Sequence, residues 1–288
     1  MTERVGFSVA RVGTIAANTF TESFRQKVYL VLLLVGLAVL AGALFFVQFS
    51  FSEQLKFVKD YCLGVLSVFG TLIAIVGTAQ MLPAELDNRT IYTTLAKPVR
   101  RLEFLLGKYL GSVMLLLLTV VIMGALFGAV LASKQRRLVA DTLREAEHIT
   151  NPNMAEVQDT IAKIRAEAFD PDLVKGVVLI FVKLSLLASI TLLFSTFSTS
   201  MVFNVVAAFM AFFAGHLRAT AAEEWARHNV VMYLLAIVPD LSTFNVADDI
   251  ILGNAIPWSH VNEVALYGLV RIVLIVAAAH FIFSKREI

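Results

Sequence analysis

Uninterrupted apolar runs of membrane-spanning length dominate this 288-residue sequence. A helix needs about 20 apolar residues to cross the hydrocarbon core of a bilayer, and six stretches of the chain approach or exceed that length. Backbone N–H and C=O groups in the bilayer have to be paired inside the segment, so continuous apolar runs indicate helices rather than the alternating strands of a barrel. The sequence therefore predicts an all-α, polytopic membrane protein with six transmembrane helices.

Composition supports this class and argues against several others. The chain is 58% hydrophobic and 16% charged, whereas soluble domains have about 45–50% apolar and about 25% charged residues. A net charge of +2 gives no indication of nucleic-acid binding. A single cysteine, Cys62, excludes an intrachain disulfide, and the five histidines are scattered along the chain. We therefore predict no catalytic residues, no cofactor site and no metal site.

Residues 1–288 are predicted to form a single transmembrane domain. Residues 1–27 carry apolar residues at helical spacing among positive charges, which is typical of an amphipathic helix in the membrane interface. Residues 28–132 then hold spans one to three, and residues 176–288 hold spans four to six. The individual spans are predicted at Val28–Ser50, Tyr61–Leu82, Leu105–Ala132, Gly176–Phe197, Met201–Leu217 and Val264–Phe283.

A polar insertion at residues 133–175 separates the two halves. Asn151-Pro152-Asn153 is a turn signal, and Asn153 with Glu156 three residues later resembles a capping box. We predict two amphipathic helices that form a hairpin, extracytoplasmic if the loop between spans two and three is cytoplasmic. Three bases directly after the third span, Lys134, Arg136 and Arg137, oppose this orientation under the positive-inside tendency.

The region before the last span is broken repeatedly by turn residues. Pro239, Gly253 and Pro257 interrupt apolar pieces that are too short to cross a bilayer. Such pieces favour a re-entrant or interfacial segment, which we predict on the outer side.

The polar stretch Pro83–Gly111 orients the other segments. It holds five bases and three acids between two apolar runs, and a short basic loop between spans is expected to face the cytoplasm. Six spans then place both termini in the cytoplasm. Pro83 favours an end to the preceding span, Glu85 and Asp87 suit the first turn of a short helix, and Pro98 limits its continuation. The alternative is an ordinary loop whose charges only set topology.

This stretch also resembles the cytoplasmic segment of ABC type-2 transporter permeases. In that family an acidic residue follows the second span, then come a short helix, a Pro–x–(Arg) turn and a Phe–x–x–Gly–Lys start to the third span. The matching residues here are Glu85, Arg89, Thr90, Leu95, Pro98, Arg101, Phe104, Gly107, Lys108 and Gly111. Members often have glycine before the threonine, where this chain has Arg89. The resemblance covers most of the chain.

The resemblance implies partners and a location. Residues 83–104 would be a coupling loop that docks on a separate ABC ATPase subunit, which binds ATP and magnesium. A second permease copy, identical or related, would complete a dimer in the bacterial cytoplasmic (inner) membrane. The coupling residues carried over in this way are Glu85, Asp87, Arg89, Thr90, Pro98 and Arg101.

Two basic residues lie well inside predicted spans. Lys183 is in the fourth span and Arg271 in the sixth. Ionisable groups in a membrane usually face a bundle interior or an aqueous cavity, which makes both residues candidates for a substrate pathway. The alternative is that both side chains snorkel to the outer interface.

Several functions remain open. Gly107-Lys108 fails the P-loop pattern, because Leu102 stands where its first glycine belongs and Tyr109 where Ser or Thr belongs, so we predict no enzyme activity in this chain. The resemblance implies a permease that exports an unidentified substrate. One alternative is a non-transporting scaffold or mechanotransmission subunit, which would link a cytoplasmic ATPase to an extracytoplasmic partner through residues 133–175. Another is a gradient-driven transporter, but no acidic residue lies within a predicted span and no inverted repeat is evident.

Overall fold

The computed structural model describes residues 7–45, 51–87, 99–148, 153–168, 170–224 and 238–285. Every regular element in these ranges is a helix. The elements are α1 (Val9–Phe24), α2 (Lys27–Ala41), η1 (Gly42–Phe45), α3 (Phe51–Ala79), α4 (Met81–Asp87), α6 (Arg101–Glu147), α7 (Met154–Ala168), α8 (Asp172–Phe197), α9 (Met201–Glu224), η2 (Ser242–Phe244), α11 (Ala247–Leu252) and α12 (Trp258–Lys285).

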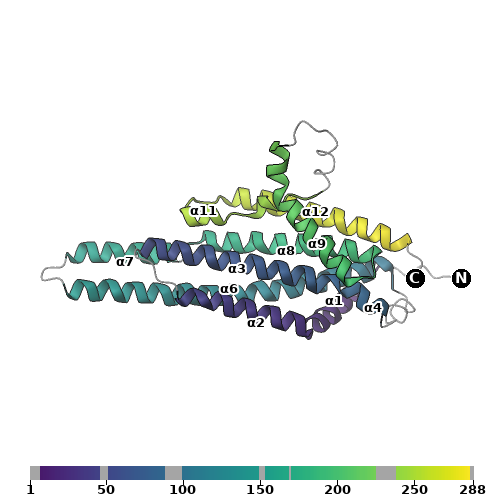
Figure 1. Ribbon diagram of the computed structural model, residues 1–288, viewed down its shortest axis with the longest axis horizontal. Coiled ribbons are helices and arrows are strands. Elements are labelled where there is room, and N and C mark those ends of the chain that lie inside the picture. Colours follow the sequence, from purple (N-terminus) through teal and green to yellow (C-terminus); the bar gives the residue numbers. More distant parts are fainter. Residues whose placement is uncertain are drawn as a thin grey trace.

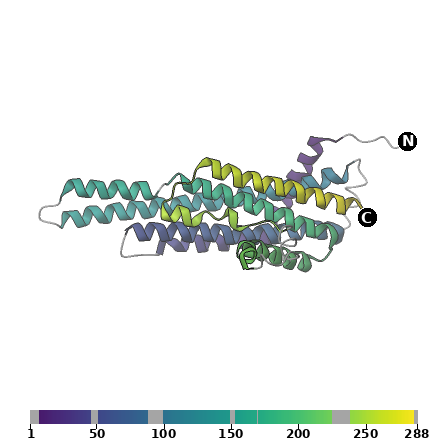
Figure 2. The same ribbon diagram turned by 90° about the horizontal axis from the view of Figure 1, so that it is seen from above.

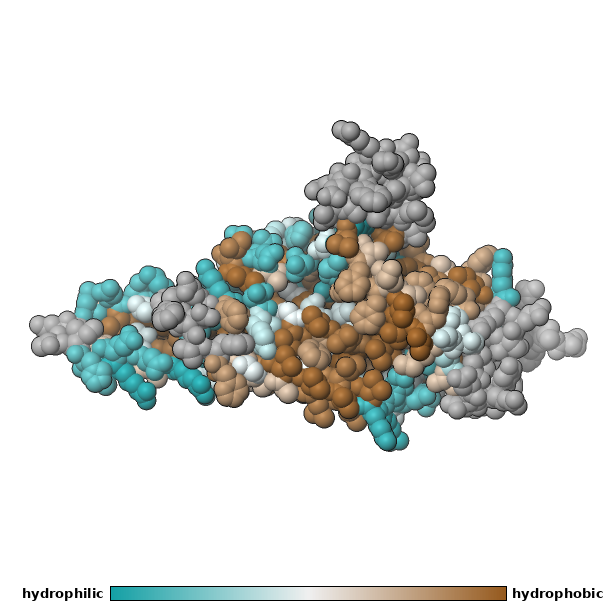
Figure 3. Space-filling model, viewed as in Figure 1, coloured by the Kyte–Doolittle hydropathy of each residue, from teal (hydrophilic) through white to brown (hydrophobic). Residues whose placement is uncertain are grey.

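Among the described residues, six helices are long and apolar enough to cross a membrane, which confirms the predicted all-α fold. They are α2 with η1, α3, α6, α8, α9 and α12. The long helices run side by side, and α1 and the end of α12 lie opposite the end at which α7 protrudes (Figures 1 and 2). Apolar side chains cover the middle of the bundle on one face, whereas the protruding end is largely hydrophilic (Figure 3).

Helix α8 is the centre of the packing. It contacts α3, α6, α9 and α12, and most of its residues from Leu179 to Thr196 are buried. The buried hydroxyls of Thr191 and Ser195 donate to carbonyl oxygens one turn earlier, at 2.9 and 3.0 Å. These bonds satisfy polar groups that have no water to pair with.

The third span and the first arm of the hairpin are one helix. We expected an end near Ser133, but α6 runs without a break from Arg101 to Glu147. Ser133 keeps helical geometry and donates its hydroxyl to the Ala129 carbonyl at 2.8 Å. The polar extension of α6 pairs with α7 to form the hairpin (Figure 1). As the sequence predicted, Asn153 precedes α7, and its side chain accepts a hydrogen bond from the Ala155 N–H at 3.3 Å.

Helix α3 also reaches further than expected. Residues 51–60, which we expected to be a short loop between spans, are the first turns of α3. Leu55 on these turns is fully buried against Ile164 and Ala168 of α7. The hairpin is therefore the outer part of a three-helix unit of α3, α6 and α7.

Helix α1 crosses α6 at two glycines spaced one turn apart. A Cβ atom at Gly107 would lie 2.6 Å from the Ile15 Cβ, and one at Gly111 would lie 2.6 Å from the Thr19 Cβ and 2.8 Å from the Ala16 carbonyl oxygen. Small residues let helix backbones approach this closely. Part of the apolar face that we expected in the membrane interface, including Ala16, is thus buried against protein. The position of α1 relative to the bilayer stays a prediction.

We expect Gly111→Val to lower the stability of the purified protein by about 1–3 kcal/mol, the usual range for overpacking. The side chain would collide with backbone as well as side-chain atoms of α1. Thermal unfolding in mild detergent measures the effect. Gly124→Val on the same helix is the matched control, because nothing lies within 4 Å of a Cβ there. Equal melting temperatures for the two variants would contradict the close crossing.

The segment between α9 and α12 packs onto the bundle. Helix α11 contacts α3 and α8, and η2 contacts α8 and α9. The Asp172 carboxylate at the start of α8 accepts the Ile256 N–H at 2.8 Å, and Lys175 donates to the Ile256 carbonyl at 2.6 Å. Gly253, with φ of 76°, ends α11 in the left-handed conformation that glycine favours. A re-entrant position in the bilayer stays a prediction.

Candidate functional site

A buried carboxylate organises the start of α6. The Glu103 side chain is fully buried and accepts hydrogen bonds from the guanidinium of Arg11, at 2.7 and 2.9 Å. It also accepts the backbone N–H groups of Ser8, at 2.7 Å, and Arg100, at 3.1 Å. The hydrogen bonds to Glu103 raise the pKa of Arg11, which therefore keeps its charge. This cluster fixes the start of α1 to the start of α6.

A second ion pair ties α4 into the same end of the bundle. The Lys108 ammonium on α6 is nearly inaccessible and pairs with Glu85 of α4. Glu22 of α1 approaches the same ammonium, at 3.7 Å, but is half exposed. One lysine thus joins three helices.

Arg101 connects this end to the last span. Its guanidinium donates to the carbonyl oxygens of Phe283, at 3.0 Å, and Ser284, at 2.9 Å. These carbonyls lie in the last turn of α12, where backbone acceptors lack helical partners and the helix dipole favours a cation. Together, Arg11, Glu85, Arg101, Glu103 and Lys108 form what we call the basal network, which joins α1, α4, α6 and α12.

The structure places the predicted coupling residues only in part. Glu85 and Arg101 are in the basal network, and Asp87 is the last residue of α4, with its side chain outside the described set. Arg89, Thr90 and Pro98 lie outside the described residues. Glu85 and Asp87, which we expected in the first turn of a short helix, lie instead in the last turn of α4, and the rest of the expected coupling helix lies outside the described residues. Sequence reasoning counted Glu103 only as one acid of the loop. Its place three residues after Arg100, at a helix start, was the available signal.

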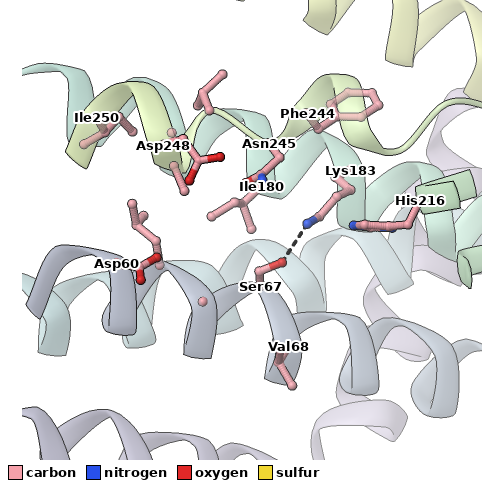
Figure 4. Close-up of a pocket in the computed structure, with 15 residues that line it drawn as sticks. Asp60, Ser67, Val68, Ile180, Lys183, His216, Phe244, Asn245, Asp248 and Ile250 are labelled. Atoms are coloured by element: carbon pink, nitrogen blue, oxygen red, sulfur yellow. Dashed lines mark hydrogen bonds between the residues drawn. The ribbon is translucent and has the colours of Figure 1, made fainter. Parts of the chain in front are cut away.

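Lys183 faces a cavity inside the bundle. Its side chain is 4% exposed, and its ammonium donates to the Ser67 hydroxyl of α3 at 2.6 Å. The cavity, of about 280 Å³, lies between α3, α8 and the η2–α11 segment (Figure 4). His216 of α9 points toward Lys183 at the same end. The Lys183 side chain is therefore packed inside the protein rather than extended to its surface.

Arg271 does not join this cavity. Its guanidinium lies over the Tyr267 ring of the same helix, 5.4 Å from the centroid, and it is not among the residues that line the cavity. The structure thus separates the two basic residues that we considered together as pathway candidates. A role for either of them in transport stays a prediction. In the part of the chain that is described, no three His, Cys, Asp or Glu side chains come together as metal ligands.

Comparison with known families agrees with this architecture. The model of the ABC-2 family transporter proteins matches residues 43–281, which include α3, α6, α8, α9 and most of α12 but none of α2. The chain belongs to the ABC-2 transporter family. The predicted resemblance to ABC type-2 permeases is thereby confirmed. No curated protein matches the chain.

Membership of the ABC-2 family identifies the kind of transporter component that this protein is. It is a multi-pass membrane protein and an ABC transporter permease, a transport component that is not itself the ATPase. The family implies an ABC ATPase as partner. The basal network of the ABC-2 protein directly flanks residues 88–98, the part of the predicted coupling loop that lies outside the described residues.

Proposed function

We propose that this permease converts ATP hydrolysis by a separate ATPase subunit into export of a substrate across the bacterial cytoplasmic membrane. The observation that supports the proposal is the basal network. Glu85 precedes residues 88–98 and Arg101 follows them, and each contacts a different helix. A displacement of the loop by a docked ATPase would therefore act on α4, α6 and α12 together.

The proposed assembly has two permease copies and two ATPase subunits. ATP and magnesium belong to the ATPase, and this chain needs no cofactor of its own. The loop 83–104 and both termini face the cytoplasm in this arrangement. Alternation of the two permeases between inward-facing and outward-facing states would move the substrate outward.

The continuous α6 helix favours a second candidate function. It begins at Arg101 in the basal network and ends at Glu147 in the hairpin. In a mechanotransmission subunit, this helix would carry movement from the ATPase to an extracytoplasmic partner bound at residues 133–175, without passage of a solute.

Co-purification tests the coupling loop. We expect an ABC ATPase to co-purify with the tagged permease in mild detergent, and Arg89→Ala to reduce its recovery severalfold. Arg136→Ala is the matched control, because Arg136 is exposed in the polar extension of α6. Glu85 is unsuitable for this test, since its loss would also leave Lys108 without its closest carboxylate. Recovery of the ATPase that is equal in both variants would rule out the loop as docking site.

Reconstitution then separates the two functions. Export predicts that the complex in vesicles accumulates a solute on the side away from the ATPase, and that shortening the hairpin leaves part of this activity. Mechanotransmission predicts no accumulation, and ATP-dependent changes in partner binding that disappear when the hairpin is shortened.

A further inference from the structure

We propose that the cavity beside Lys183 binds a small zwitterion, whose anionic group, a carboxylate or phosphate, is held by Lys183 and Ser67. Six residues carry the argument: Asp60, Ser67, Lys183, His216, Asn245 and Asp248. The inference deepens the proposed function, because it names the chemistry of a ligand that the permease would carry. It rests on the proposed function only where the bound molecule is taken to be the transported one.

The buried ammonium calls for an anion. Lys183 is 4% exposed, and among the described residues no carboxylate lies within ion-pair distance of it. Its described partner is the neutral hydroxyl of Ser67. An uncompensated buried charge is unfavourable, and a lysine ammonium has three N–H donors. A bound anion would supply the missing negative charge and accept hydrogen bonds from the remaining N–H donors of Lys183.

The same end of the cavity offers further polar groups. The His216 ring points toward Lys183. Asn245 lies on the segment between η2 and α11, across the cavity from Ser67 of α3 (Figure 4). Three other elements thus surround the lysine of α8. An anionic group with several oxygen acceptors fits this arrangement better than a halide ion does.

The other end of the cavity is acidic. Asp60 of α3 and Asp248 of α11 line it, both are exposed, and both lie well away from Lys183 in the close-up (Figure 4). A ligand with only negative charge would be repelled by these carboxylates. A zwitterion would be oriented by them, with its cation toward Asp60 and Asp248 and its anion toward Lys183. The small volume, about 280 Å³, suits a single small molecule or one lipid headgroup.

Calorimetric titration of the purified full-length protein tests the site. The probes are O-phosphoethanolamine and γ-aminobutyrate. Inorganic phosphate and ethanolamine are controls that carry charge of only one sign. We expect at least one zwitterion to bind more tightly than both controls. Lys183→Gln should weaken that binding about tenfold or more, and Ser67→Ala about threefold to tenfold, as expected for lost bonds to a charged group.

Matched variants separate a lost site from a lost fold. Lys163→Gln makes the same change on the exposed face of α7 and should leave the affinity unchanged. Asp248→Asn, on an exposed side chain, should weaken the zwitterions but not inorganic phosphate. If Lys183→Gln does not fold, Ser67→Ala and Asp248→Asn decide the question. Zwitterion binding no tighter than that of the controls, or unchanged affinity in those two variants, would overturn the proposal.

Two sources can supply this chemistry, a free solute or a lipid headgroup. Nanodiscs of phosphatidylethanolamine and of phosphatidylglycerol distinguish them. Weaker apparent binding of the soluble probe in phosphatidylethanolamine alone identifies a headgroup site, and equal binding in both lipids identifies a solute site. The titration needs neither ATP nor an ATPase, so failure of the ligand proposal and failure of the coupling proposal give different results.

Discussion

Replacing Glu85 with alanine is expected to destabilise the permease by about 3–5 kcal/mol, the range found when one member of a buried ion pair is removed. The Lys108 ammonium is 3% exposed and would lose its closest carboxylate. Glu22 lies 3.7 Å from the same nitrogen and is 49% exposed, so it can replace only part of that interaction. Thermal and denaturant unfolding in mild detergent measure the loss.

A double-mutant cycle separates the unpaired charge from lost packing. Glu85→Ala combined with Lys108→Met removes both charges and keeps most of the lysine volume. We expect the double variant to recover more than half of the stability that Glu85→Ala loses, because no buried charge is left without a partner. Glu22→Gln should change stability by less than about 1 kcal/mol. Additive effects of Glu85→Ala and Lys108→Met would contradict the coupling between the two side chains.

Glu103→Ala is expected to have the second-largest effect, about 3 kcal/mol. The variant removes an acceptor that serves the Arg11 guanidinium and two backbone N–H groups. A hydrogen bond to a charged group contributes about 1.5–3 kcal/mol. Several such bonds share one carboxylate, and water can reach Arg11, so the total is less than their sum. Unfolding in detergent and protease cleavage near residue 8 both report the change.

The expected pattern distinguishes Glu103 from an ordinary helix-start acid. Glu103→Gln retains an acceptor oxygen and should lose less stability than Glu103→Ala does. Cleavage near residue 8 should increase in both variants, because each weakens the attachment of α1 to α6. A loss below about 0.5 kcal/mol in Glu103→Ala would show that the carboxylate does not hold α1 on α6.

The apolar runs were sufficient to predict the spans but not the helix limits. Hydropathy reports where a segment meets lipid, whereas a helix ends where backbone pairing ends. Residues 51–60 and 133–147 are more polar than the spans beside them, yet both continue a neighbouring span as helix. Each continuation packs on α7, where Leu55 is buried against Ile164. Contacts between segments far apart in sequence determine this, and a local pattern does not contain them.

The charged residues show the same limit. The sequence singled out Glu85 and Arg101 as loop residues, but the structure gives them partners on α6 and α12, 23 and 182 residues away. Glu103 has its main partner, Arg11, 92 positions earlier. Lys183 was recognisable as unusual because a charge within a span is rare. Its partner Ser67 was not recognisable, since serines are frequent in apolar helices of this chain.

The unbroken α6 has a mechanical consequence. At 1.5 Å per residue, its 47 residues form a rod about 70 Å long. A tilt of about 5° around the end held by Arg101 and Glu103 would swing the far end by about 6 Å. Because an intact helix has no joint along its length, the tip would move in the same stroke as the base. A movement imposed at one end of α6 would therefore reach the other end without a change in the length of the helix.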